Sequence, residues 1–125
     1  MTVDTHRPIA PKEAAIVEWL LDHAPLGDVT AYRAKPVAEL RVVATCDCGC
    51  CSLHFEPLGP PHPRLIADAM ASYPDGQQAY LLLWGRDGNI VWLEVSDCQP
   101  GSSRRVPEIA DLRSYEQLGQ ELLEK

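Results

Sequence analysis

Ala79-Tyr80-Leu81-Leu82-Leu83-Trp84 and Ile90-Val91-Trp92-Leu93-Glu94-Val95 are two apolar stretches separated by Gly85-Arg86-Asp87-Gly88-Asn89. An Asp-Gly pair between apolar strands is among the strongest short-range signals for a β-hairpin. Because successive strand residues point to opposite faces, Tyr80 and Trp84 would share one face of the first strand. The stretch therefore predicts a β-hairpin, the clearest in the chain.

A second hairpin is predicted upstream, over residues 40–56. Residues 40–46 alternate between two faces, Asp47-Cys48-Gly49 is suited to a tight turn, and residues 50–56 return as a second strand. On the returning strand, alternation places Cys51, Leu53 and Phe55 on one face and Cys50, Ser52 and His54 on the other. The cysteine-rich turn is thus expected to join two strands of one sheet.

Three helices are predicted around these hairpins. The first opens at Pro11-Lys12-Glu13 and carries an apolar stripe, a middle helix spans residues 65–73, and a third begins at Ser114 with Gln117 as its capping-box partner. Residues 1–10 are polar and are expected to be a loose lead-in. We therefore expect a single α+β domain over residues 1–125, with a small antiparallel sheet of two hairpins and N-terminal, middle and C-terminal helices packed on it.

Composition argues against several classes of function. The net charge is −7, and only Arg104-Arg105 place two basic residues side by side, so we expect no nucleic-acid binding. The longest apolar run, residues 79–84, is far shorter than the ~20 residues of a membrane span. No basic and apolar leader is seen at the start, which predicts a cytoplasmic protein. The acidity favours solubility, or a basic protein partner.

Cys46-Asp47-Cys48-Gly49-Cys50-Cys51-Ser52-Leu53-His54 holds four of the five cysteines. A tight cysteine cluster in a reducing compartment points to metal binding before disulfides. Zinc prefers four cysteine or histidine ligands, whereas dense thiolates also suit Cu(I). The candidate ligands are Cys46, Cys48, Cys50 and Cys51, with His54 or Cys98 completing the set. The alternative is that Cys46 and Cys51 are buried packing residues and that Cys48 and Cys50 belong to the turn.

Catalytic chemistry has weaker support. Cys48 and Cys51 form a Cys-x-x-Cys pair, but in redox proteins that motif begins a helix, and here a hairpin turn is predicted. Cys50 or Ser52 beside His54 could form a nucleophile–base pair, yet no oxyanion hole or orienting residue is evident. We therefore expect no enzymatic activity.

Two motifs in the same order resemble those of a group of small, uncharacterised bacterial proteins. The first is the Cys-x-Cys-Gly-Cys-x-Ser segment within residues 45–53, and the second is the Trp-x-Arg-Asp-Gly hairpin with Leu93-Glu94-Val95. Val106-Pro107-Glu108 also fits a segment near the C-terminus of that group. The resemblance implies a small stand-alone α+β protein and supplies no catalytic residues. In that pattern Cys51 replaces a proline or small residue, His54 replaces an acidic or polar residue, and Cys98 has no counterpart.

The sequence favours a protein that binds another protein, as immunity and inhibitor proteins do. Trp84, Trp92, Glu94 and Asp97 on the second hairpin are the candidate contact residues, because an exposed tryptophan marks an interface and the carboxylates suit a basic partner. Aromatic residues on a sheet face are nevertheless more often core residues. Binding of zinc or Cu(I) by the cysteine cluster is the alternative function.

Overall fold

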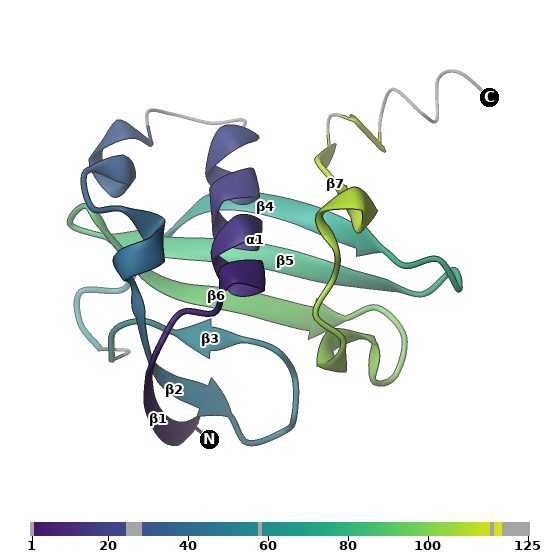
Figure 1. Cartoon of the computed structure of the whole chain (residues 1–125), viewed down its shortest axis with the longest axis horizontal. Helices are drawn as coiled ribbons and strands as arrows, with labels where there is room; N and C mark the ends of the chain where they lie inside the picture. The colour runs from purple at the N-terminus through teal and green to yellow at the C-terminus, as the bar shows by residue number, and fades with distance from the viewer. Residues whose placement is uncertain (1, 25–28, 58, 116, 119–125) are drawn as a thin grey trace.

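One antiparallel sheet of seven strands organises the molecule (Figure 1). The computed structural model describes residues 2–24, 29–57, 59–115 and 117–118. The strands lie in the order β1-β2-β3-β6-β5-β4-β7, so the two predicted hairpins are neighbours through the β3–β6 pair. Their bounds are β1 Thr2–Pro8, β2 Arg41–Cys46, β3 Leu53–His54, β4 Arg64–Ser72, β5 Gln78–Arg86, β6 Asn89–Asp97 and β7 Leu112–Arg113.

The central hairpin β5–β6 is confirmed. Arg86 pairs with Asn89, which leaves Asp87 and Gly88 as the turn. Asp87 has a φ of 52° and Gly88 a φ of 78°. Positive φ at both central residues is the hairpin turn that Asp-Gly favours, because its twist matches that of the flanking strands.

Helix α1, Pro11–Asp22, covers one face of the sheet (Figure 1). Its buried residues Ile16, Val17, Leu20 and Leu21 join one core cluster with alternate residues of the central strands, such as Leu81, Leu83 and Leu93. Arg7 of β1 fixes the start of the helix through two 2.8 Å bonds to Glu13. Short 3-10 turns complete this side, η1 Thr30–Arg33, η2 Val37–Glu39, η3 Ser102–Arg104 and η4 Ile109–Asp111. None of the described helices has the length and apolar character that a membrane crossing requires.

The predicted middle helix is wrong, because residues 64–72 form strand β4. A register shift between Leu65 and Ala67 buries two consecutive residues, Ile66 and Ala67. This interrupts the alternation expected of a strand, so the apolar residues of the segment fit helical spacing instead. Beyond the shift, Ala69 and Ala71 are fully buried. Pairing with β5 along the whole strand outweighs the local helical preference of this alanine-rich segment.

The two chain ends also differ from the expectation. Residues 2–8 are not a loose lead-in but edge strand β1, paired with β2 and mostly exposed, which is why no apolar pattern marks it. The predicted C-terminal helix falls largely on residues 116 and 119–125, outside the described residues. At its start, the Ser114 amide donates to Gln117 and the Gln117 amide donates to the Ser114 hydroxyl, as the capping box predicts.

Gly85 is required where η1 packs on the sheet. A Cβ atom added to Gly85 would lie 2.9 Å from Tyr32 Cζ and closer still to its Cε1. Because Tyr32 is itself packed against the core, we expect Gly85→Ala to lower the free energy of unfolding by about 1–3 kcal/mol. Urea unfolding would measure this, with Gly59→Ala as the matched control, since a Cβ at Gly59 meets open space. Equal effects of the two substitutions would contradict the packing argument.

Candidate functional site

A tight turn at the end of β2 carries the cysteine cluster. The Gly49 amide donates to the Cys46 carbonyl at 3.4 Å, which closes a turn over residues 46–49. Gly49 has a φ of 91°, a conformation that side chains disfavour, so the turn depends on glycine. The returning chain re-enters the sheet only at Leu53, so residues 50–52 lead from the turn into strand β3 rather than being part of it.

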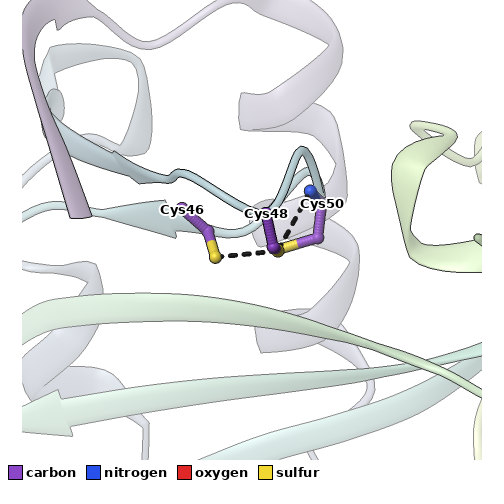
Figure 2. A group of neighbouring side chains, drawn as sticks. All are labelled: Cys46, Cys48 and Cys50. Atoms are coloured by element: carbon purple, nitrogen blue, oxygen red, sulfur yellow. Dashed lines mark hydrogen bonds between the residues drawn. The ribbon is translucent and has the colours of Figure 1, made fainter. Parts of the chain in front are cut away.

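Three thiols gather on this turn. The Sγ atoms of Cys46, Cys48 and Cys50 all lie within 4.8 Å of one another. Figure 2 shows the Cys46 and Cys48 side chains turned toward each other, with a sulfur–sulfur distance of 2.8 Å. The Cys50 backbone amide also donates to Cys48 Sγ, at 3.4 Å. The turn over residues 46–49, rather than strand alternation, folds the chain back and brings the three thiols together. The three cysteines could hold a metal ion.

The surroundings of Cys48 and Cys46 shift their thiol pKa values in opposite directions. Hydrogen bonds from the Cys46 thiol and the Cys50 amide lower the pKa of Cys48, and the positive charge of Arg104 acts in the same direction. The same bond to Cys48 raises the pKa of Cys46 to about 11. These contacts favour the charged form of Cys48 and disfavour that of Cys46.

The other predicted ligands lie elsewhere. The Cys51 thiol contacts the Arg105 carbonyl, and burial raises its pKa to about 12, so it is a packing residue. His54 is buried and stacks on Trp92, with 5.3 Å between ring centroids. Cys98 follows the last residue of β6, and its backbone amide donates to the Gln78 carbonyl and to Ser102 Oγ. Among the described residues, none of these three joins the thiol group of Cys46, Cys48 and Cys50.

A loop that sequence reasoning did not link to the cysteines supports their turn. The Ser103 carbonyl accepts the Cys51 amide at 2.8 Å, and the Arg104 guanidinium lies beside Gly49. Asp97 holds this loop, because its carboxylate accepts the Ser103 and Gly101 amides. Asp97, predicted as a partner contact, thus has a structural task. The sequence signal for this role of Asp97 is a carboxylate placed shortly before Gly101-Ser102-Ser103. In such loops a side-chain oxygen commonly accepts hydrogen bonds from the backbone amides.

The sheet face opposite α1, here called the open face, carries the predicted aromatic residues. A row of paired residues crosses it in the order Ala44, His54, Trp92, Trp84 and Leu65. The Trp92 and Trp84 rings stack with 5.9 Å between centroids, in line with His54. Both tryptophans are half-buried, whereas Leu65 is 43% exposed. The open face therefore combines an ordered aromatic row with exposed apolar surface.

Glu94 and Tyr80 also belong to the open face. Glu94 accepts the Trp84 indole N–H at 3.1 Å, and Tyr80 is 40% exposed. Trp84, Trp92 and Glu94 thus lie together on the open face, while Asp97 lies at the strand end in the loop described above.

The nucleophile–base pair that the sequence left as the weaker alternative does not form in the described residues. The Ser52 hydroxyl accepts the Val95 amide at 2.8 Å and lies 3.3 Å from the Val95 carbonyl, so it extends the pairing between the returning chain and β6. The Cys50 thiol donates to the same hydroxyl at 3.2 Å. His54 makes no hydrogen bond with either residue. Ser52 is therefore committed to the backbone of the sheet.

Burial of His54 predicts a pH dependence of stability. Burial lowers the pKa of His54 below its usual 6.5 in the folded state, so the unfolded chain binds a proton more readily. The stability gained by burying neutral His54 is fully present above pH 6.5, the pKa in the unfolded chain. It is lost as the pH falls toward the lowered pKa of the folded state. We expect His54→Gln to reduce the difference in unfolding free energy between pH 7.5 and pH 5, because the substitution removes the titrating group. Urea titrations at both pH values, with exposed His62→Gln as control, measure it; an unchanged difference would refute this role.

Comparison with protein-family models, curated proteins and solved structures finds no match to this chain. The resemblance to a group of small bacterial proteins therefore stays a prediction, and the argument for function depends on the geometry of the site.

Proposed function

We propose that this protein binds a soft metal ion, Cu(I) before zinc, through Cys46, Cys48 and Cys50, and that it holds the ion without catalysing a reaction. The observation that carries this proposal is the gathering of three Sγ atoms within 4.8 Å of one another on one turn. One ion at their centre would bond to all three after small rotations of the side chains. Thiolates are the ligands that soft metal ions select.

The number of ligands favours Cu(I). A structural zinc site has four protein ligands in a tetrahedron, and within the described residues no fourth cysteine, histidine or carboxylate joins the three thiols. Cu(I) is satisfied by three thiolates in a plane. Zinc at the same turn would need a fourth ligand from solvent or from another molecule. The set therefore supports Cu(I) binding with higher affinity than zinc binding.

Exposure of the turn suits exchange of the ion. Cys48 is exposed, and Cys46 and Cys50 are half-buried, so an incoming thiol can reach the metal from solvent. Structural metal sites are instead closed by their own ligands. We therefore propose that the protein receives and releases the ion rather than needing it to fold.

An anaerobic titration of the reduced protein with Cu(I), and separately with Zn²⁺, tests the proposal. We expect one Cu(I) per chain by native mass spectrometry, with a thiolate-to-copper absorption band in the near ultraviolet. Zn²⁺ should bind more weakly than Cu(I) in a competition with a calibrated chelator. A folded protein that takes up neither ion in the presence of that chelator would refute the proposed function.

Binding of a protein partner through the open face is the second candidate function. It is supported by the exposed apolar side chains of Leu65 and Tyr80 beside half-buried Trp84. Asp68 and Glu94 flank Leu82 on the same face, which favours a partner with basic residues. Such a surface would act as immunity and inhibitor proteins do, by covering another protein.

This second function is tested by affinity capture with matched surface variants. We expect a specific partner to be lost with Tyr80→Ser on the open face and retained with Val3→Ser, which changes another exposed apolar residue, on edge strand β1. Capture that both variants retain, or both lose, would argue against a partner on the open face.

A further inference from the structure

A hollow of about 370 Å³ lies on the open face at the β1 end of the aromatic row. In that row Asp4 pairs with Ala44, and Ala44 pairs with His54. The small side chain of Ala44 therefore stands between two larger neighbours and forms the floor of a depression. We call this depression the Ala44 hollow; it is lined by Thr2, Asp4, His6, Val43, Ala44, His54, Glu56 and Pro57. Its volume is within the range of small-molecule sites.

His54 is a buried polar side chain that faces this hollow without a partner. It is 6% exposed, and it makes no hydrogen bond or ion pair with the described residues, its ring contact being the stack on Trp92. Burial lowers the pKa of His54, so the neutral ring offers one acceptor nitrogen and one N–H donor. Because His54 makes no hydrogen bond to the described residues, its ring nitrogens are free to bond to a ligand in the hollow.

Among the other polar groups of the hollow, the Asp4 and Glu56 carboxylates only accept hydrogen bonds, whereas the Thr2 hydroxyl and the His6 ring can also donate. No lysine or arginine is among the lining residues. Arg86 reaches Glu56 Oε1 from outside the hollow at 3.3 Å, which leaves Asp4 as the uncompensated negative charge. An acceptor-rich, negatively charged hollow complements a ligand that donates hydrogen bonds and carries positive charge. The floor and walls from Ala44, Val43 and Pro57 add apolar contact.

We propose that the Ala44 hollow is a binding site for a small primary alkylammonium ion. The ammonium group lies between the Asp4 carboxylate and the acceptor nitrogen of His54, and the alkyl chain lies along Ala44, Val43 and Pro57. This site is separate from the three thiols, none of which lines the hollow. Binding of the alkylammonium ion is therefore independent of metal binding by the three thiols.

Titration of the ¹⁵N-labelled protein with n-butylammonium chloride at pH 7.5 tests the proposal. We expect saturable shifts of the Asp4 and Ala44 amides and of the His54 ring signals. n-Butanol, which has the same chain without the charge, should bind at least about fivefold more weakly, and sodium butyrate should not compete. Equal shifts with butanol, shifts that grow linearly without saturation, or no shifts at all would overturn the proposal.

Asp4→Asn provides the matched variant. Asp4 is exposed on an edge strand, so the substitution should leave the fold intact, which the spectrum itself verifies. We expect it to weaken butylammonium binding about fivefold or more, because it removes the charge and keeps the shape. Asp22→Asn, on helix α1 at the other face of the sheet, removes the same charge and should leave the affinity unchanged. An equal loss of butylammonium affinity in Asp4→Asn and Asp22→Asn would show that only the net charge of the protein matters, and it would contradict a site in the hollow.

Discussion

Replacing Cys48 with serine is expected to lower the affinity for Cu(I) by at least about a hundredfold. Cys48 is the central member of the three, because it accepts hydrogen bonds from the Cys46 thiol and the Cys50 amide. A serine hydroxyl is a poor ligand for a soft ion, and two thiolates would remain. Since Cys48 is exposed, the folded state should lose little stability. Competition with a Cu(I) chelator under anaerobic conditions measures the affinity, and urea unfolding measures the stability.

Cys51→Ser is the matched control for this prediction. Cys51 directly follows Cys50 in sequence, but its thiol contacts the Arg105 carbonyl and the core. The Cys51→Ser variant should therefore bind Cu(I) with an affinity within about threefold of the wild-type value. It should instead lower the free energy of unfolding by about 1 kcal/mol, because a polar hydroxyl replaces a half-buried thiol. Cys48→Ser is thus expected to lower the Cu(I) affinity with little loss of stability, and Cys51→Ser to lower the stability with little loss of Cu(I) affinity. A Cu(I) affinity that depends on Cys51 as strongly as on Cys48 would refute the assignment of the three ligands.

The strands of the central hairpin could be predicted from sequence because of their apolar runs and their turn. β5 and β6 are nearly continuous apolar stretches on either side of Asp87-Gly88, so local signals suffice for this hairpin. β4 was mistaken for a helix because the irregularity between Leu65 and Ala67 breaks its alternation. β1 was missed because an edge strand with one exposed side needs few apolar residues. In both cases pairing with a distant strand, rather than local sequence, determines the structure.

The candidate ligands could be predicted from sequence in part. The density of cysteines located the site, but spacing alone admitted Cys51, His54 and Cys98 as further ligands. The structure separates them through the turn, which gathers the Cys46, Cys48 and Cys50 thiols, whereas the Cys51 thiol contacts the Arg105 carbonyl. Spacing in the sequence does not distinguish these two outcomes. The positions of Arg104 and of the Asp97 loop depend on tertiary contacts with the turn, so no local pattern could have revealed them.

Replacing Arg86 with alanine is expected to lower the free energy of unfolding by about 2–3 kcal/mol. The Arg86 guanidinium donates to the Gly59, Pro61 and Pro57 carbonyls at 2.8–3.1 Å and to Glu56, and its side chain is 13% exposed. It thereby fixes the loop that follows β3 over the stacked tryptophans of the open face. Without it, several carbonyls lose their charged donor, and the loop should move away from Trp84 and Trp92. Urea unfolding measures the stability, and acrylamide quenching of tryptophan fluorescence measures the exposure of the rings.

Two further variants separate this anchoring role from a general effect of charge. Arg64→Ala removes an exposed arginine at the start of β4 that makes no side-chain hydrogen bond to the described residues, and it should change the unfolding free energy by less than about 0.5 kcal/mol. Arg86→Lys keeps the charge but lacks the planar fork that reaches several carbonyls, so it should fall between wild type and Arg86→Ala. If acrylamide quenches the tryptophan fluorescence of Arg86→Ala no faster than that of Arg64→Ala, the loop that follows β3 is held by its prolines and by packing on the tryptophans. The cavity of about 200 Å³ that Gly59, His62 and Pro63 form with Trp84 and Trp92 would then be independent of Arg86.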